Sequence, residues 1–213
     1  MSKKAIILGA SGLVGGELLK KLIDCNEFSS ILVLSRQSLG KQHEKIIEII
    51  CDFNELGAIA KEVTGDVLFC CIGTTRKKTP NLNDYRKIDV DIIKNVGEIA
   101  KKNGVQQAHL VSSVGANENS SNFYLKIKGE AEKQLKELAF QYVGLYRPAM
   151  LIGKRKERRP GEKFGQFVSP FFDLFMGKGK YHSIKAEMVA NSMYWNAKNP
   201  MKGIRVLYYK DMV

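Results

Sequence analysis

The sequence lacks the features that would assign it to several common classes of protein. No apolar run approaches the roughly 20 residues that a membrane-spanning helix needs, and the opening MSKK leads directly into a strand-like run without the apolar core of a secretory signal peptide. Only 4 cysteines and 3 histidines occur, and none has the spacing of a CxxC pair or of metal ligands. These absences predict a cytoplasmic protein with reduced thiols, no membrane span and no metal site.

Acidic residues are fewer than basic ones, which leaves a net charge of +12. A basic balance suits an anionic ligand, an acidic protein partner or nucleic acid. The densest basic cluster, residues 154–159 (KRKERR), is typical of a solvated loop. Because the sequence has no helix-turn-helix, zinc knuckle or RNP-type aromatic strand, we expect no specific binding of nucleic acid.

The first part of the chain combines an apolar run, a glycine-rich turn and a helical pattern. Residues 3–8 (KKAIIL) predict a buried strand, residues 9–15 (GASGLVG) a turn, and residues 17–25 a helix. In a nucleotide-binding fold, such glycines allow a sharp turn, a close approach of the backbone to a pyrophosphate, and tight packing of helix on sheet. The N-terminus of the helix then faces the anion. The spacing GxxGxxG differs from the commoner GxGxxG, and the alternative is a plain tight turn.

Strand-like and helical segments alternate through the next 130 or so residues. Apolar runs predict strands at 31–34, 46–51, 67–72, 108–111 and 143–146, and helical patterns span 82–102 and 123–139. This alternation predicts a Rossmann-like α/β fold, a doubly wound parallel sheet with helices on both faces. We expect one NAD(P)-binding domain over 1–213, with its nucleotide-binding core in 1–151. The substrate-side part, 152–213, would hold helices at 164–176 and 184–197 and a strand at 204–208.

The end of the second predicted strand indicates which dinucleotide binds. NAD enzymes place an acid there for the ribose hydroxyls, but no acid occurs from residue 29 to 41. Arg36 instead fits a 2′-phosphate, which predicts NADP(H), although a surface arginine is the alternative. Asp52 follows the third strand and would either accept a bond from the adenine amino group or cap a helix near Asn54. Gly73 and Thr74 follow the fourth strand and suit contact with ribose or phosphate.

A Y-x-x-x-K motif, Tyr124 and Lys128, lies on the helix after the fifth strand. Residues four apart share a helix face, so the lysine ammonium would favour the phenolate and lower the pKa of the tyrosine. Such a tyrosine can donate a proton to a carbonyl oxygen during hydride transfer. A serine at the preceding strand end, Ser113 or Ser112, would orient that oxygen.

Four stretches of the sequence together resemble the atypical branch of the short-chain dehydrogenase/reductase superfamily, and more closely its Tat-interacting-protein-like NAD(P)H-binding oxidoreductases. They are ILGASGLVG (7–15), CCIGTTR (70–76), SSVGANENSSNFYLKIKGEAE (112–132) and YRPAMLIGKRKERRPGE (146–162). The resemblance implies Ser113, Tyr124 and Lys128 as the catalytic set. It also implies a set of residues that hold NADP(H): Gly9, Ser11, Gly12, Leu13, Val14, Gly15, Arg36, Asp52, Phe53, Cys71, Gly73, Thr74, Ser112, Tyr124, Lys128, Arg147, Pro148 and Leu151.

Two functions are compatible with these patterns. The first is an NADPH-dependent oxidoreductase that reduces a carbonyl of a small molecule with Tyr124 as proton donor. The second is an NADP(H)-binding, redox-sensing regulatory protein that acts through a protein partner without significant turnover. The intact set of Ser113, Tyr124 and Lys128 favours the enzyme, and the basic charge favours a partner. The patterns leave open the substrate, the direction of the reaction and the oligomeric state.

Overall fold

The computed structural model describes residues 2–153 and 182–213. The expected helix at 164–176 and the basic cluster at 154–159 lie outside the described residues. Within the described residues, no helix is long and apolar enough to cross a lipid bilayer.

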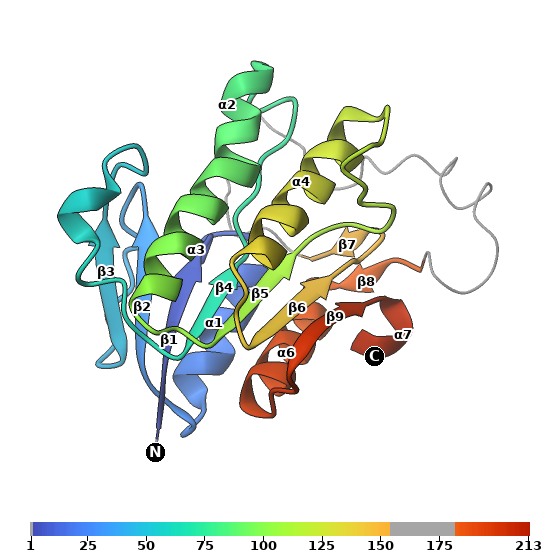
Figure 1. Cartoon of the computed structure of the whole chain (residues 1–213). Helices are drawn as coiled ribbons and strands as arrows, with labels where there is room; N and C mark the ends of the chain where they lie inside the picture. The colour runs from blue at the N-terminus through green and yellow to red at the C-terminus, as the bar shows by residue number, and fades with distance from the viewer. Residues whose placement is uncertain (1, 154–181) are drawn as a thin grey trace.

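A seven-stranded parallel sheet forms the centre of the molecule (Figure 1). Its strand order is β3-β2-β1-β4-β5-β6-β9, which is the Rossmann arrangement with one added strand. The strands are β1 Lys3–Leu8, β2 Phe28–Ser35, β3 Ile46–Ile50, β4 Val67–Cys70, β5 Gln107–Val111, β6 Tyr142–Tyr146 and β9 Gly203–Leu207. The predicted fold class is therefore confirmed, and the strand from the end of the chain joins the same sheet beside β6.

The central strands are continuous apolar runs because helices cover both faces of the sheet. On one face, α1 (Leu13–Asp24) packs beside α6 (Ala186–Lys198), with the short α7 (Tyr209–Met212) near them. On the other face, α3 (Ile92–Lys102) packs beside α4 (Phe123–Glu137), as Figure 1 shows. Two separate apolar clusters result, one on each side of the sheet.

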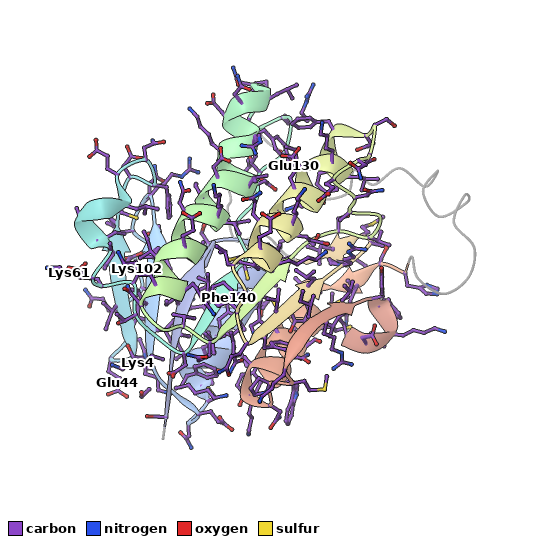
Figure 2. The ribbon with its side chains drawn as sticks, viewed as in Figure 1. Lys4, Glu44, Lys61, Lys102, Glu130 and Phe140 are labelled. Carbon is purple, nitrogen blue, oxygen red and sulfur yellow. The ribbon has the colours of Figure 1, made fainter. Side chains whose placement is uncertain are left out.

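The helical pattern at 82–102 is one continuous rod with an irregular middle. Asn81 caps its start by accepting hydrogen bonds from the backbone N–H groups of Asn83 and Asp84. The rod then runs through α2 (Leu82–Arg86), a π-helical turn (η2, Lys87–Asp91) and α3. An ion pair of 3.1 Å between Arg86 Nε and Glu130 Oε2 links it to α4; Glu130 is labelled in Figure 2.

Several sequence-based expectations differ from the structure. The helix expected at 17–25 begins at Leu13, within the expected turn, and the strand expected at 67–72 ends at Cys70. The helix expected near Asn54 is only a four-residue 3-10 turn (η1, Leu56–Ile59), because Asp52 bonds to Asn54 and closes a local turn instead. The helix expected from 184 begins at Ala186, because residues 184–185 form strand β8. This strand pairs in parallel with β7 (Leu151–Ile152).

Candidate functional site

The site predicted from the sequence lies along one edge of the sheet. Because all seven strands are parallel, the segments that follow them emerge at the same carboxyl edge, where ligands bind in such folds. That edge collects the segments predicted to hold the cofactor: 9–15 after β1, 36 after β2, 52–53 after β3, 71–74 after β4, 112–113 after β5 and 147–151 after β6. The helix α4 brings Tyr124 and Lys128 to the site from one face.

The glycine-rich turn after β1 has the geometry of a phosphate cradle. Gly9 has φ +81°, and a Cβ there would lie 2.6 Å from the backbone carbon of Cys71. A Cβ at Gly15 would lie 2.2 Å from the carbonyl oxygen of Gly9, so only glycine lets α1 approach the strand this closely. Gly12 starts α1 without a side-chain cap, and no acid lies in the first turn of that helix. Uncapped N–H groups at a helix N-terminus, beside a turn without bulk, fit the pyrophosphate of a dinucleotide.

The end of β2 carries Arg36, whose side chain is exposed. The loop that follows is braced by Glu48 from β3, an acid that the sequence pattern did not connect with this place. Glu48 accepts hydrogen bonds from the Ser38 hydroxyl at 2.8 Å and from the Leu39 backbone N–H at 2.7 Å. A hollow of about 560 Å³ lies at this loop, lined by Ser38, Gly40, Lys41, Gln42, His43, Ile46 and Glu48. None of the residues of the Y-x-x-x-K motif lines this hollow.

Three residues expected near adenine and ribose have structural roles visible in the fold. The carboxylate of Asp52 accepts hydrogen bonds from the backbone and side-chain nitrogens of Asn54 at 2.9 and 2.8 Å. The Phe53 ring is only 7% exposed and belongs to the apolar cluster under α3. Cys71 packs on the opposite side, against the cluster under α1. It is a free thiol whose pKa is raised by burial and by its neighbour Cys70. Their contacts with a cofactor remain predictions.

Tyr124 and Lys128 lie one helical turn apart in contrasting surroundings. The Tyr124 side chain is 42% exposed, whereas Lys128 is 6% exposed. The Lys128 ammonium lies 2.8 Å from Oδ1 of Asp89, which is fully buried. Burial alone lowers the pKa of Lys128, but the charges of Asp89 and Tyr124 outweigh burial and raise it. Sequence reasoning missed Asp89, although an acid four residues after the core residue Tyr85 is a signal, because it must share the buried helix face.

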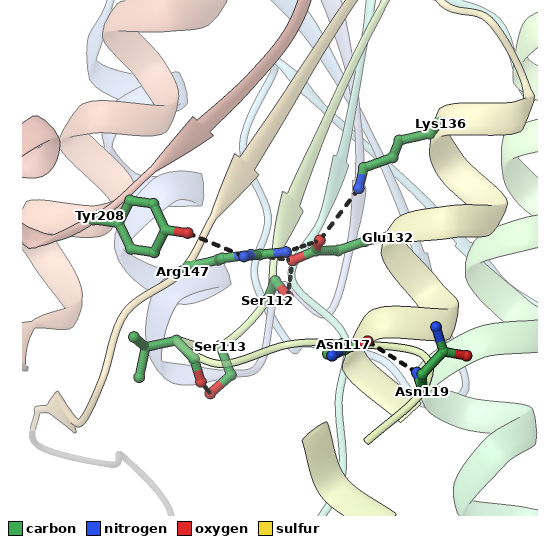
Figure 3. Close-up of polar contacts among 9 residues, drawn as sticks. Ser112, Ser113, Asn117, Asn119, Glu132, Lys136, Arg147 and Tyr208 are labelled. Carbon is green, nitrogen blue, oxygen red and sulfur yellow. Dashed lines mark hydrogen bonds and ion pairs between the residues drawn. The ribbon is translucent and has the colours of Figure 1, made fainter. Parts of the chain in front are cut away.

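The two serines after β5 have different partners. The Ser112 hydroxyl donates to Oε1 of Glu132 at 2.6 Å within a buried network (Figure 3). Within the described part of the chain, the Ser113 hydroxyl has a 3.3 Å hydrogen bond to the carbonyl oxygen of Val114 and no other, and Ser113 is 5% exposed. Ser113 is therefore the serine whose hydroxyl is less committed to the described residues, and its catalytic role stays a prediction.

The network around Glu132 also holds Arg147. The guanidinium donates to both carboxylate oxygens of Glu132, at 2.8 and 2.6 Å, and to the Tyr208 hydroxyl at 3.0 Å (Figure 3). The hydrogen bonds that Arg147 donates to Glu132 keep the pKa of Arg147 raised. Arg147 thus ties the end of β6 to α4, and its expected contact with the nicotinamide remains a prediction. Glu132 was also missed, although it lies four residues after Lys128 on the same helix face.

The segment between β5 and α4 crosses the helix directly beside the lysine. A Cβ at Gly129 would lie 2.1 Å from the backbone nitrogen of Glu118, so the crossing requires glycine. The crossing is held by a 3.0 Å hydrogen bond from the Asn117 N–H to the Leu125 carbonyl. Pro148 fixes the same loop from β6, because its carbonyl accepts the N–H of Val114 at 3.0 Å. Ser113 and the Y-x-x-x-K helix are therefore held together by backbone contacts.

Leu151 and the glycine turn also approach each other. Leu151 lies in β7 and packs against the apolar cluster that contains Val14, with Leu13 at its border. A Cβ at Gly153 would lie 3.1 Å from a methyl group of Leu13. The structure thus brings the segment after β6 beside the N-terminus of α1. Among the described residues, no group of three or more His, Cys, Asp or Glu side chains is placed to hold a metal ion.

Comparison with known proteins decides the family. A family profile described as NAD(P)H-binding matches residues 9–170. The chain belongs to the NAD(P)H-binding family. Rat protein HTATIP2 is 38% identical over 165 residues, which are 76% of this chain and 68% of that protein. The mitochondrial protein FMP52 of Candida glabrata is 34% identical over 182 residues, 84% of this chain and 74% of that protein. The resemblance to Tat-interacting-protein-like members of the family is thereby confirmed.

Several solved structures of enzymes share the fold of this chain. A UDP-N-acetylglucosamine 4-epimerase from Methanobrevibacter ruminantium matches with a TM-score of 0.73 and 17% identity, over 97% of this chain and 76% of that one. The enzyme WbmH from Bordetella bronchiseptica, solved in complex with NAD⁺, matches with a TM-score of 0.75 and 14% identity, over 98% and 76%. At these identities the likeness concerns the fold alone.

Proposed function

We propose that the protein is an NADPH-dependent oxidoreductase that reduces a carbonyl group of a small molecule. One observation carries the proposal. An exposed tyrosine, Tyr124, lies one helical turn from a buried, ion-paired lysine, Lys128, near the carboxyl edge of the sheet. The chain itself belongs to the NAD(P)H-binding family. An NADPH-binding protein without turnover would not need a phenol in that position.

Each residue of the catalytic set has a separate task in this proposal. Bound NADPH supplies a hydride to the carbonyl carbon. Tyr124 donates its phenolic proton to the carbonyl oxygen, so that the carbonyl becomes an alcohol, and the phenolate is then reprotonated from solvent. The Lys128 ammonium stabilises that phenolate, and Ser113 donates a hydrogen bond that orients the carbonyl oxygen.

Oxidation of NADPH in the presence of a panel of aldehydes and ketones tests the proposal. We expect wild-type protein to turn over at least one of these substrates. Tyr124→Phe should lower kcat by roughly 10²- to 10⁴-fold, because the proton donor is removed, while NADPH binding measured by fluorescence should change by far less. Equal turnover by the variant would contradict the role of Tyr124.

Arg36 is proposed to select NADPH over NADH through the 2′-phosphate. Arg36→Asp should weaken binding of NADPH by at least roughly 10-fold, because a charge-assisted bond is replaced by repulsion. Binding of NADH, which lacks that phosphate, should change far less. Titration of both dinucleotides against both proteins measures the effect, and an equal loss for the two would contradict the assignment.

A regulatory function is the second candidate, and the net charge of +12 is the observation that favours it, since a basic surface suits an acidic protein partner. Tight NADPH binding with no turnover across the whole panel would support this function. We propose the cytoplasm as the location of the protein, and fractionation of cells that express it would reveal a mitochondrial location, the one printed in the name of the FMP52 relatives.

A further inference from the structure

The carboxylate of Asp89 connects two parts of the site. Its Oδ2 accepts the backbone N–H of Thr74 at 2.8 Å, and its Oδ1 lies 2.8 Å from the Lys128 ammonium. Apart from that ammonium, Oδ1 has no hydrogen-bond partner among the described residues. Among the described residues, Lys128 is the cation that forms an ion pair with this carboxylate, which has no exposed surface.

The π-helical turn explains how an acid reaches this position. A π turn inserts an extra residue into an α-helix and rotates the side chains on it, and such turns are frequent at functional sites. Here the turn Lys87–Asp91 carries Asp89 inward, while Asp91 stays at the surface and pairs with Arg86 at 2.5 Å. The irregular turn is thus located where the helix meets the site.

Two neighbours of Asp89 are matched to this arrangement. Tyr85, one turn earlier, donates to the Thr74 carbonyl at 3.1 Å, so that the helix holds the backbone of Thr74 from both its N–H and its C=O. A Cβ at Gly73 would lie 3.3 Å from Oδ1 of Asp89 and 3.5 Å from the Lys128 nitrogen. The absence of a side chain at Gly73 therefore leaves room for the Asp89–Lys128 ion pair.

We propose that Asp89 is a positioning residue that locks the Lys128 ammonium and the segment 73–74 into one arrangement, with the remaining N–H groups of the lysine available to Tyr124 and to a ligand. This role rests on the proposed reductase function, because it specifies how the lysine is kept charged beside the tyrosine. Neither the Y-x-x-x-K motif nor the glycine turn indicates this role of Asp89.

The physical reason is the cost of a buried charge. An unpaired ammonium in a buried position tends to release its proton, and a neutral amine would stabilise a phenolate poorly. The groups that face Lys128 are Asp89 from the π turn and Tyr124 and Glu132 from α4, while Tyr85 interacts with Asp89 and Tyr124. Of these, only Asp89 makes an ion pair with Lys128, so removing its charge should have the largest effect on the lysine.

Titration of the Lys128 amine, followed by NMR of protein with labelled lysine side chains, tests the proposal without any substrate. The Lys128 resonance is assigned by its loss in Lys128→Arg. In wild type we expect a midpoint above the usual lysine value of about 10.4. In Asp89→Asn, which keeps the side-chain shape, the midpoint should fall by at least about 2 pH units. The matched control Asp91→Asn changes an exposed acid of the same π turn and should leave the midpoint unchanged.

The outcomes separate this proposal from the proposed function. An unchanged midpoint in Asp89→Asn, or a wild-type midpoint well below about 10.4, would overturn the role of Asp89 even if the protein is a reductase. The wild-type measurement decides the matter if the variant does not fold. Where wild type turns over a carbonyl, Asp89→Asn should also shift the alkaline limb of the kcat–pH profile, which Asp91→Asn should not. An absence of turnover in wild type would count against the reductase and leave the amine titration valid.

Discussion

Two buried ion pairs, four residues apart on α4, differ in what their cation can do. Glu132 receives bonds from Arg147 and Ser112, and Lys136 lies 3.6 Å from it. Among the described residues, Lys128 makes its ion pair with Asp89, and an exposed tyrosine lies one turn away. An arginine cannot release its proton in a protein, whereas a buried lysine can. The permanent charge thus lies in the network that joins the sheet to the helix, and the titratable charge lies in the proposed reaction centre.

The difference teaches how one helix can be rigid and chemically active at once. The Glu132 network connects the ends of β5, β6 and β9 to α4 through several hydrogen bonds, which favours a single geometry. The Lys128–Asp89 pair keeps N–H capacity on the lysine for a ligand. Substitutions in the first pair should therefore change stability, and substitutions around the second should change chemistry.

Glu132→Gln should give the largest effect on stability. It leaves the largely buried Arg147 guanidinium without its carboxylate, and breaking a buried pair in this way costs about 3–5 kcal/mol. Urea unfolding measures the change. The matched control is Glu130→Gln on the same helix, whose partner Arg86 is more exposed, and it should cost less than about 1 kcal/mol. Similar losses for both variants would remove the distinction between the network and an ordinary surface pair.

The two serines after β5 test the same difference, because Ser112 belongs to the Glu132 network and Ser113 to the proposed reaction centre. Ser113→Ala should lower kcat by roughly 10²-fold or more, as loss of a group that orients the reacting oxygen does, with little change in the unfolding free energy. Ser112→Ala should cost about 1–3 kcal/mol of stability, because Glu132 loses a buried hydrogen bond. Steady-state kinetics and urea unfolding of both variants measure these effects, and the opposite pattern would exchange the roles of the two serines.

Asp89→Asn should lower the free energy of unfolding by about 1–3 kcal/mol at neutral pH. The loss is smaller than for Glu132→Gln because Lys128 can release its proton and become neutral. In wild type the pKa of Lys128 is raised, so the contribution of the pair is complete below about pH 10.4 and is lost as the pH rises through the folded-state value. In the variant the lysine pKa is lowered, so its stability rises with pH over the range just below about 10.4. The difference between the two proteins, measured by urea unfolding, should therefore shrink as pH rises; a constant difference would show that the lysine keeps its proton without Asp89.

His109 is another buried ionisable group, and no acid among residues 2–153 and 182–213 forms an ion pair with it. It is fully buried on β5, its Nδ1 contacts the Tyr146 hydroxyl at 3.0 Å, and its Nε2 has no partner among the described residues. Burial, with a smaller effect of Lys3, lowers the pKa of His109 to about 3. Between that value and about 6.5 only the unfolded chain binds the proton, so stability should fall on acidification by up to about 1.4 kcal/mol per pH unit. His109→Phe should reduce this slope in urea unfolding between these limits, and an unchanged slope would show that other groups cause it.

The order and type of the elements could be predicted from sequence because each strand and helix carries its own period. The apolar runs at 3–8 and 143–146 and the helical pattern at 82–102 correspond to β1, β6 and the rod α2–η2–α3. The prediction of a helix near Asn54 was wrong because a local turn around Asp52 competes with a helix there. The π turn could not be predicted, because the spacing of apolar residues along a helix does not indicate where one extra residue is inserted.

Only the parts of the candidate site that contain a sequence motif could be predicted. The glycines and the Y-x-x-x-K pair have fixed local spacing, so they could be read directly. Asp89, Glu132 and Glu48 act through contacts with segments distant in sequence, and a single acid in a helix or strand usually indicates a solvated face. Their burial arises from the packing of α4, the π turn and β3 against other elements. The four-residue spacing from Tyr85 and Lys128 indicates a shared helix face for Asp89 and Glu132, but it does not identify their partners.

A structure of the protein with NADPH bound tests the central proposal most directly. We expect the pyrophosphate on the N–H groups at the start of α1, the 2′-phosphate beside Arg36, and the nicotinamide ring within hydride-transfer reach of a space that adjoins the Tyr124 hydroxyl. NADPH bound elsewhere, or bound here with the Tyr124 hydroxyl directed away from the nicotinamide, would contradict the oxidoreductase function.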